Sequence, residues 1–220
     1  MKDFTDITVI LDRSGSMQTV KEATISGFDE FVQSQKLQGD NAALTLVQFD
    51  DHYDYVFKNV PINSVSSIKE LYEPRGMTAL LDAIGRTINE TGKRLAEIPE
   101  QDRPNKVSCV IITDGFENAS KEFTSSKIND MIKHQMSAYN WTFIFLGANQ
   151  DAIASAEQLG MKAGWAATYN STNKGTKKAF TRMSDKMCSH RSCTSDLSAI
   201  QYSCQNSVWT EEEKTDLTSE

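Results

Sequence analysis

Short apolar segments alternate with helix-like segments along almost the whole chain, and this alternation constrains the fold more than any other feature. Residues 4–11 and 106–113 are rich in β-branched and other apolar side chains, as expected of strands buried on both faces of a parallel sheet. Residues 17–36 instead place apolar side chains at every third or fourth position, which is typical of a helix with one buried face. The alternation therefore predicts an α/β protein.

The remaining segments predict how the sheet is built. Residues 43–49 and 53–57 are strand-like and too close together for a crossover helix, so they should form an antiparallel hairpin at one edge. The other expected strands are residues 141–146 and 163–168, and the other expected helices are residues 79–95, 125–137, 150–159 and 174–187. We predict a mostly parallel, six-stranded, doubly wound sheet with one antiparallel edge strand and helices on both faces.

One domain accounts for residues 1–188. Residues 189–220 are rich in Ser, Thr, Glu and Gln and contain few large apolar side chains, so they are expected to form a flexible polar tail. Before this tail, the helix expected at residues 174–187 has a basic face. This face is interpreted as solvated, with a docking or nucleic-acid contact as the alternative, and consists of Lys174, Lys177, Lys178, Arg182 and Lys186.

Charge and hydropathy limit the partners and the compartment. The net charge of −7 makes duplex nucleic acid and anionic membranes unfavourable partners. The N-terminal residues contain no basic leader followed by an apolar run, and no apolar segment is long enough to span a membrane. We therefore expect a cytoplasmic protein without a direct nucleic-acid or membrane partner.

The four cysteines predict no metal framework. Cys109 lies inside an apolar strand and is expected to be a small core residue. Cys188, Cys193 and Cys204 lie near the C-terminus with His190 among them, but zinc sites favour closer pairs such as Cys-x-x-Cys. Reduced thiols are the favoured interpretation, and a zinc site is the alternative.

Oxygen-bearing side chains follow two of the predicted strands. Asp12 and Asp114 each come directly after a buried strand, and the carboxyl ends of neighbouring parallel strands meet at one edge of a sheet. Ser14 and Ser16 leave the first strand at alternate positions, and Thr78 stands where a helix is expected to begin. Two carboxylates and three hydroxyls are hard ligands, which suit Mg²⁺, Mn²⁺ or Ca²⁺. We predict a divalent-metal site formed by these residues.

The segments that carry these residues resemble the metal-ion-dependent adhesion site of von Willebrand factor A (vWA) domains. They are LDRSGSM at residues 11–17, GMTAL at residues 76–80 and TDG at residues 113–115, and the resemblance extends over about residues 4–188. It implies a non-catalytic, metal-dependent protein-binding module in a Rossmann-like fold, with Mg²⁺ (or Mn²⁺ or Ca²⁺) as the cofactor. It also implies that motion of the C-terminal helix tunes affinity.

The resemblance also assigns a role to each site residue. Ser14 and Ser16 would bind the metal directly, Asp12 and Asp114 directly or through water, and Thr78 according to the conformational state. The remaining coordination position would accept an Asp or Glu side chain of a partner protein. A chain of this size is most similar to stand-alone bacterial and bacteriophage members of the family, some of which are associated with tellurite-resistance or stress operons.

Two other functions are considered. A Mg²⁺-dependent phosphohydrolase could use Asp12 as its nucleophile, but such enzymes carry a second aspartate where this chain has Ser14. His52, His134 and His190 are expected to lie away from the strand-end loops, so the protein is predicted not to be an enzyme. A role in a ribonucleoprotein or stress-response assembly is the other alternative, although the acidic charge argues against direct RNA binding.

Simpler structural roles exist for several of these residues. Ser14, Ser16 and Thr78 could each serve only as helix N-caps, which Ser and Thr commonly do. Glu117 and Asn118, just beyond Asp114, are interpreted as solvent-facing residues rather than ligands. His52 is interpreted as a polar residue at the tip of the hairpin.

Overall fold

The computed structural model describes residues 2–148, 151–161, 163–192 and 208–219. Within these residues, six strands form one sheet in the order β3-β2-β1-β4-β5-β6, and only β3 runs antiparallel to its neighbour. The strands are β1 (Lys2–Asp12), β2 (Ala42–Phe49), β3 (Tyr53–Pro61), β4 (Pro104–Thr113), β5 (Thr142–Ala148) and β6 (Ala166–Tyr169). The predicted mostly parallel sheet with one antiparallel edge strand is confirmed.

The burial of each strand follows its place in the sheet. Every residue of β2 is buried, as is every residue of β5, because helices cover both faces of these inner strands. The edge strand β3 has no buried residue and mixes exposed with half-buried positions. At the other edge β6 is shorter than residues 163–168 predicted, since residues Ala163–Trp165 form a 3₁₀ turn and the strand starts at Ala166.

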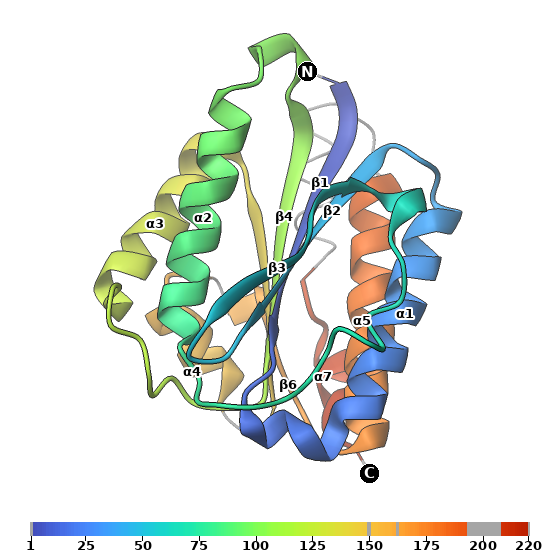
Figure 1. Cartoon of the computed structure of the whole chain (residues 1–220), viewed down its shortest axis with the longest axis vertical. Helices are drawn as coiled ribbons and strands as arrows, with labels where there is room; N and C mark the ends of the chain where they lie inside the picture. Colours follow the sequence, from blue (N-terminus) through green and yellow to red (C-terminus); the bar gives the residue numbers. More distant parts are fainter. Residues whose placement is uncertain (1, 149–150, 162, 193–207, 220) are drawn as a thin grey trace.

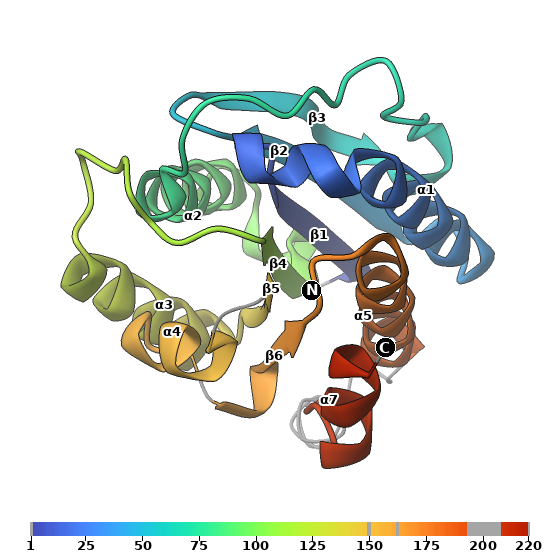
Figure 2. The same ribbon diagram turned by 90° about the horizontal axis from the view of Figure 1, so that it is seen from below.

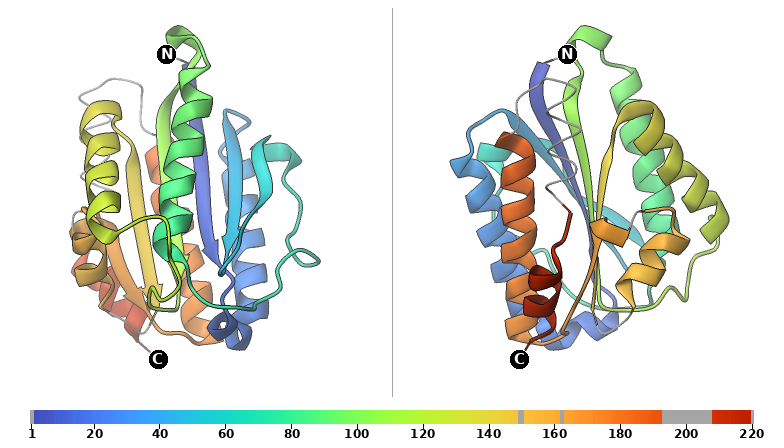
Figure 3. Two further views of the ribbon diagram at one scale, coloured as in Figure 1. Left: turned by 60° about the vertical axis from the view of Figure 1, so that its left-hand side comes forward. Right: turned by 180° about the vertical axis from the view of Figure 1, so that it is seen from behind.

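Helices cover both faces of the sheet, and each set encloses its own apolar core. One face carries α1 (Lys21–Leu37), α5 (Asn173–Ser192) and α7 (Glu211–Thr218), and the other carries α2 (Leu80–Ala96), α3 (Ser125–Tyr139) and α4 (Ala152–Gln158) (Figures 1–3). Shorter 3₁₀ helices are Gly15–Val20, Ile62–Ser64 and Glu100–Asp102.

The first helix starts later than its sequence pattern predicts. Residues Gly15–Val20 form a 3₁₀ helix, and only then does α1 begin at Lys21. Met17 and Val20 are both buried, and their spacing of three residues matches the three residues per turn of a 3₁₀ helix. The tighter turn lets both side chains reach the core directly after the strand-end loop.

Within the expected polar tail, residues 208–219 include a helix that packs on the domain, and residues 193–207 lie outside the described residues. Trp209 and Leu217 are buried, and α7 packs along α5, which itself continues to Ser192 (Figure 2). Part of the basic face of α5 is covered by this helix, since Lys178 and Arg182 pair with Asp216 and Lys186 pairs with Glu213 at 2.7 Å. Opposite charges and two large apolar side chains were enough to order a segment that is polar on average.

The helices α1 and α5 approach so closely at Gly27 that a side chain there would collide with the neighbouring helix. A methyl group on Gly27 would lie 2.5 Å from Cδ2 of Phe180. We expect Gly27→Ala to lower the free energy of unfolding by about 1–2 kcal/mol, because overpacking outweighs the gain of about 1 kcal/mol in helix propensity. Urea denaturation followed by circular dichroism measures this change.

Gly92 on α2 provides the matched control. A methyl group there would meet no atom within 4 Å, so Gly92→Ala should raise the free energy of unfolding by up to about 1 kcal/mol. If both substitutions stabilise the protein, the close approach of α1 and α5 at Gly27 is not as described.

Membrane-spanning helices are not found: in the part of the chain that the structure describes, no helix combines sufficient length with sufficient apolar character to cross a bilayer.

Candidate metal centre

The two aspartates predicted as ligands lie at the same edge of the sheet. Asp12 is the last residue of β1, and Asp114 directly follows β4, the parallel neighbour of β1. Asp12 is fully buried, and its carboxylate accepts the backbone N–H of Ser14 at 2.6 Å and the hydroxyl of Thr113 at 2.5 Å. The topology therefore brings both acidic residues to the carboxyl end of the central strands.

The three predicted hydroxyls surround one position beside these carboxylates. Ser14 Oγ lies 3.1 Å from Ser16 Oγ, and Ser16 Oγ donates to Asp114 Oδ1 at 2.5 Å. A methyl group placed on Gly115 would lie 3.0 Å from Thr78 Oγ1, 3.7 Å from Ser16 Oγ and 3.8 Å from Ser14 Oγ. Three loops far apart in the sequence thus bring oxygen atoms around a space that the absence of a side chain at Gly115 leaves free.

The electrostatics of this group favour a cation. Burial raises the pKa of the Asp12 carboxyl group to about 6, against hydrogen bonds from Thr113 and Ser14 that lower it, and the charge of Asp114 adds to the rise. Burial also raises the pKa of Asp114, opposed by hydrogen bonds from Ser16 and Ser171. Asp12 is buried and Asp114 is half-buried, and a divalent ion between the two carboxylates would stabilise their charged forms.

Helix capping does not occupy these hydroxyls. Ser14 is the N-cap residue of the 3₁₀ helix, but its side chain makes no capping hydrogen bond. The N-cap of α2 is Ala79, so Thr78 is not a cap residue either. Since Ser14 and Thr78 are nearly fully buried while Ser16 is exposed, the group is open to solvent on the Ser16 side.

Backbone hydrogen bonds hold the first two loops against each other. The N–H of Gly15 donates to the carbonyl of Gly76 at 3.2 Å, and the N–H of Arg75 donates to the carbonyl of Arg13 at 2.7 Å. Gly76 has a φ of +68°, a backbone conformation that other residues rarely adopt, and a methyl group there would also displace the carboxylate of Asp51, whose Oδ1 would lie 2.2 Å away. The position of Thr78 is therefore set by contacts two and three residues before it.

The third loop is fixed to the start of α2. Asn118 accepts the N–H of Thr78 at 2.9 Å, and Glu117 accepts the N–H of Leu81 at 2.9 Å. Asp82 accepts the N–H groups of Lys121, Glu122 and Phe123 in return. Asn118 is exposed, as predicted, and holds the residue before the N-cap of α2, whereas Glu117 is half-buried and satisfies one of the unpaired N-terminal N–H groups of that helix.

An ion-pair network beneath the loops was not predicted from the sequence. Asp50 is fully buried, and its Oδ2 accepts Arg13 Nε at 2.9 Å and Arg75 Nε at 3.0 Å. Although burial alone would raise the pKa of Asp50, hydrogen bonds from His52, Arg75 and Arg13 hold it below its ordinary value. The sequence did contain an indication of this network. Arg13 and Arg75 lie in or beside two of the site loops, and two consecutive aspartates, Asp50 and Asp51, directly follow a predicted strand.

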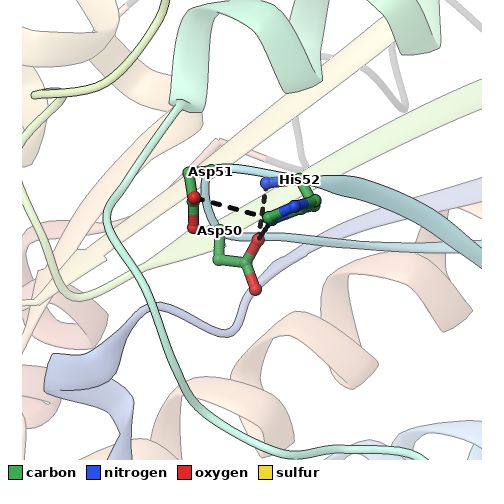
Figure 4. A group of neighbouring side chains, drawn as sticks. All are labelled: Asp50, Asp51 and His52. Atoms are coloured by element: carbon green, nitrogen blue, oxygen red, sulfur yellow. Dashed lines mark hydrogen bonds and ion pairs between the residues drawn. The ribbon is translucent and has the colours of Figure 1, made fainter.

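His52 lies nearer this edge of the sheet than expected. It follows β2, so it stands at the carboxyl end of a parallel strand, and the prediction that all three histidines lie away from the strand-end loops is wrong for it. Its ring contacts Asp50 at 3.3 Å and Asp51 at 3.6 Å, as Figure 4 shows. Both oxygens of Asp50 already have partners, since two arginines hold Oδ2 and the backbone N–H of His52 donates to Oδ1 at 2.5 Å.

The predictions for the cysteines are tested only in part. Cys109 is buried in β4 as expected, and burial raises the pKa of its thiol to about 12. Cys188 is half-buried on α5, and Gln35 Nε2 lies 3.3 Å from its sulfur. Cys193 and Cys204 lie outside the described residues, so the alternative of a zinc site stays untested.

The pattern of strands and loops matches one protein family. The model of the von Willebrand factor type A domain matches residues 6–185. The chain belongs to the vWA family. A sequence comparison with curated proteins gives no match for this vWA domain.

Solved structures of low identity share the fold. Proximal thread matrix protein 1 from the mussel byssus has a TM-score of 0.64 at 20% identity, over 84% of this chain and 48% of that one. A second structure of that protein is described as having a zinc-occupied MIDAS motif, that is, a metal-ion-dependent adhesion site, and has a TM-score of 0.61 at 20% identity, over the same shares of the two chains.

Two further vWA structures extend the comparison. A von Willebrand factor type A protein from Catenulispora acidiphila has a TM-score of 0.59 at 15% identity, over 84% of this chain and 43% of that one. Manganese-loaded TRAP protein from Plasmodium vivax has a TM-score of 0.50 at 16% identity, over 66% of this chain and 57% of that one. This vWA domain therefore spans about half the length of the mussel protein and less of the bacterial one, and the likeness shows the fold alone.

Proposed function

We propose that this vWA domain binds a divalent cation through Asp12, Ser14, Ser16, Thr78 and Asp114, and uses that cation to bind an acidic side chain of a partner protein. The observation that carries the proposal is the position beside Gly115, which lies within 4 Å of the hydroxyl oxygens of Thr78, Ser16 and Ser14. Five oxygen-bearing residues with two carboxylates suit Mg²⁺, Mn²⁺ or Ca²⁺. The zinc and manganese in two structural relatives support a divalent ion without choosing among these.

The balance of charge explains why such an ion would attract a partner. The carboxylates of Asp12 and Asp114 together only neutralise a dication, and the hydroxyl ligands add no charge. A cation held in this way keeps its affinity for a further carboxylate, and the exposed side of Ser16 leaves room for one to approach. We therefore propose a non-catalytic binding role, in which the cation holds the carboxylate of the partner.

A melting experiment tests metal binding. With Mg²⁺ at a hundred times its dissociation constant, linkage adds about 2.7 kcal/mol to the free energy of unfolding. For a chain of this length, the midpoint measured by differential scanning calorimetry should then rise by about 5–10 °C relative to protein in EDTA. Identical curves in Mg²⁺, Mn²⁺, Ca²⁺ and EDTA would falsify the proposed metal site.

A second assay separates recognition from catalysis. A fluorescent peptide with one aspartate should bind in Mg²⁺ and be released by EDTA, whereas the same peptide with asparagine should not bind. The enzymatic alternative predicts instead that p-nitrophenyl phosphate is hydrolysed in Mg²⁺ and that Asp12→Ala stops the reaction. We expect no turnover, and a rate that depends on Asp12 would replace the binding proposal with a hydrolytic one.

A further inference from the structure

Two large apolar side chains stand exposed on the loops of the candidate metal centre. Met77 is 55% exposed and lies between Gly76 and Thr78, and Phe116 is 68% exposed and directly follows Gly115. The other large apolar residues described as exposed are Leu37, Leu71 and Tyr139. Of these, Leu37 and Tyr139 lie at the C-terminal ends of α1 and α3, so the site loops carry two of the five.

The segments that hold these two side chains lie against each other. The N–H of Asn118 donates to the carbonyl of Thr78 at 3.0 Å, and a methyl group on Gly115 would lie 3.0 Å from Thr78 Oγ1. Met77 and Phe116 are each one residue away from this contact, so they stand on adjacent loops beside the same group of oxygen atoms. We call this pair the apolar rim.

The backbone around the apolar rim is fixed rather than free to fold the side chains inward. The carbonyl of Gly76 accepts a hydrogen bond from Gly15, and the N–H of Thr78 donates to Asn118, so both neighbours of Met77 are held. Exposed apolar surface on rigid loops beside a polar site marks an interaction surface more often than a scattered apolar residue does. Such a surface is already ordered, so a partner that covers it loses little conformational entropy there.

We propose that the apolar rim contacts large apolar side chains that flank the metal-binding carboxylate of the partner. This inference rests on the proposed function and specifies its partner: an extended segment with a central Asp or Glu. In an extended segment, residues two positions apart point the same way, so apolar residues two positions before and after the acid would face Met77 and Phe116. The cation supplies attraction for the carboxylate, and the apolar rim supplies the preference for this segment over other acidic ones.

Two fluorescent heptapeptides test the inference by anisotropy in Mg²⁺. The first has a central aspartate, leucines two positions to either side and glycine elsewhere, and the second has glycine in place of both leucines. We expect the leucine peptide to bind at least about tenfold more tightly, since covering two large side chains contributes more than 1.4 kcal/mol, the equivalent of tenfold. Met77→Ser and Phe116→Ser should each reduce this advantage, and the double variant should remove most of it.

Controls distinguish this inference from the proposed function. Leu37→Ser removes a side chain that is 86% exposed at the C-terminal end of α1, and it should leave both peptide affinities unchanged. The melting rise with Mg²⁺ should persist in the Met77 and Phe116 variants, which reports an intact metal site. Binding of both peptides with equal affinity in Mg²⁺, and release of both in EDTA, overturns the apolar rim while supporting the metal-dependent function.

Other outcomes are equally decisive. Binding of the leucine peptide that persists in EDTA and is lost in Phe116→Ser supports the apolar rim and overturns the role of the cation. Binding of neither peptide overturns both. Concentration-dependent self-association that Met77→Ser abolishes in sedimentation velocity would assign the surface to a second copy of this chain and overturn the inferred partner.

Discussion

Replacing Ser14 by alanine is expected to abolish metal-dependent binding while the fold remains intact. The Ser14 hydroxyl is one of three that surround the position beside Gly115, and it is the hydroxyl that leaves the end of β1 first. Removing even groups outside a metal's coordination shell costs about 10–100-fold in affinity, so removing a direct ligand should cost at least as much. Isothermal titration with Mg²⁺ and peptide anisotropy measure the two losses.

The fold should survive Ser14→Ala because the side chain makes no capping hydrogen bond to the 3₁₀ helix that follows, and its contact with Ser16 Oγ at 3.1 Å involves an exposed residue. The backbone N–H of Ser14 also donates to Asp12, and alanine keeps this bond. Ser26→Ala is a matched control on α1, where the hydroxyl only donates to the carbonyl of Ala23 within the helix. Undiminished Mg²⁺ affinity in Ser14→Ala would exclude this hydroxyl as a ligand.

The largest loss of stability is expected for Asp50→Ala. Asp50 is fully buried and accepts hydrogen bonds from Arg13, whose side chain is only 8% exposed, and from the half-exposed Arg75. Removing one partner of a buried pair leaves the other charge without compensation and typically costs about 3–5 kcal/mol. Urea denaturation at neutral pH measures this loss, which should also weaken Mg²⁺ binding because Arg13 and Arg75 lie in or beside the loops of the site.

Asp54→Ala is the control for the same network. Asp54 pairs with Arg13 and also approaches Arg75, but its side chain is 53% exposed, so its loss should cost less than about 1 kcal/mol. Equal losses for Asp50→Ala and Asp54→Ala would mean that burial does not decide the strength of these ion pairs.

The pH dependence of stability gives an independent check on Asp50. Its folded-state pKa is depressed, so the stability that it contributes is present above its unfolded pKa of about 3.9 and is lost as the pH falls through the folded value. Wild-type protein should therefore lose more stability than Asp50→Ala as the pH falls below about 4. Parallel acid titration curves for the two proteins would contradict this account.

Much of the architecture was predictable because buried parallel strands and amphipathic helices leave strong local patterns. The burial of β2 and of residues 106–113 of β4 follows from their apolar runs, and the hairpin of β2 with β3 follows from the shortness of their connection. The ends of helices and strands were less predictable. The 3₁₀ helix Gly15–Val20 and the short strand β6 depend on how their side chains pack against neighbouring helices and strands. The helix α7 was not predicted: the capping box of Thr210 and Glu213 is local, but the ion pairs with α5 and the burial of Leu217 depend on tertiary contacts.

The sequence by itself determined the chemistry of the candidate site. Two carboxylates and three hydroxyls after predicted strand ends define a set of hard oxygen ligands whatever the loops do, because ligand preference is a property of the atoms. Two further features are local in the sequence. Ser14 and Ser16 occupy alternate positions, and Asp12 and Asp114 each directly follow a predicted strand. The structure agrees with their expected placement at one edge of the sheet.

Only the tertiary structure decided what surrounds those ligands. The burial of Asp50 between Arg13 and Arg75, and the exposure of Met77 and Phe116 on adjacent loops, both arise from segments brought together by the order of the strands. No local pattern encodes them, because burial and ion pairing depend on neighbours that are distant in the chain. The sequence therefore specifies the class of ion that the candidate site would suit, a hard divalent cation, and the fold specifies which residues support and surround that site.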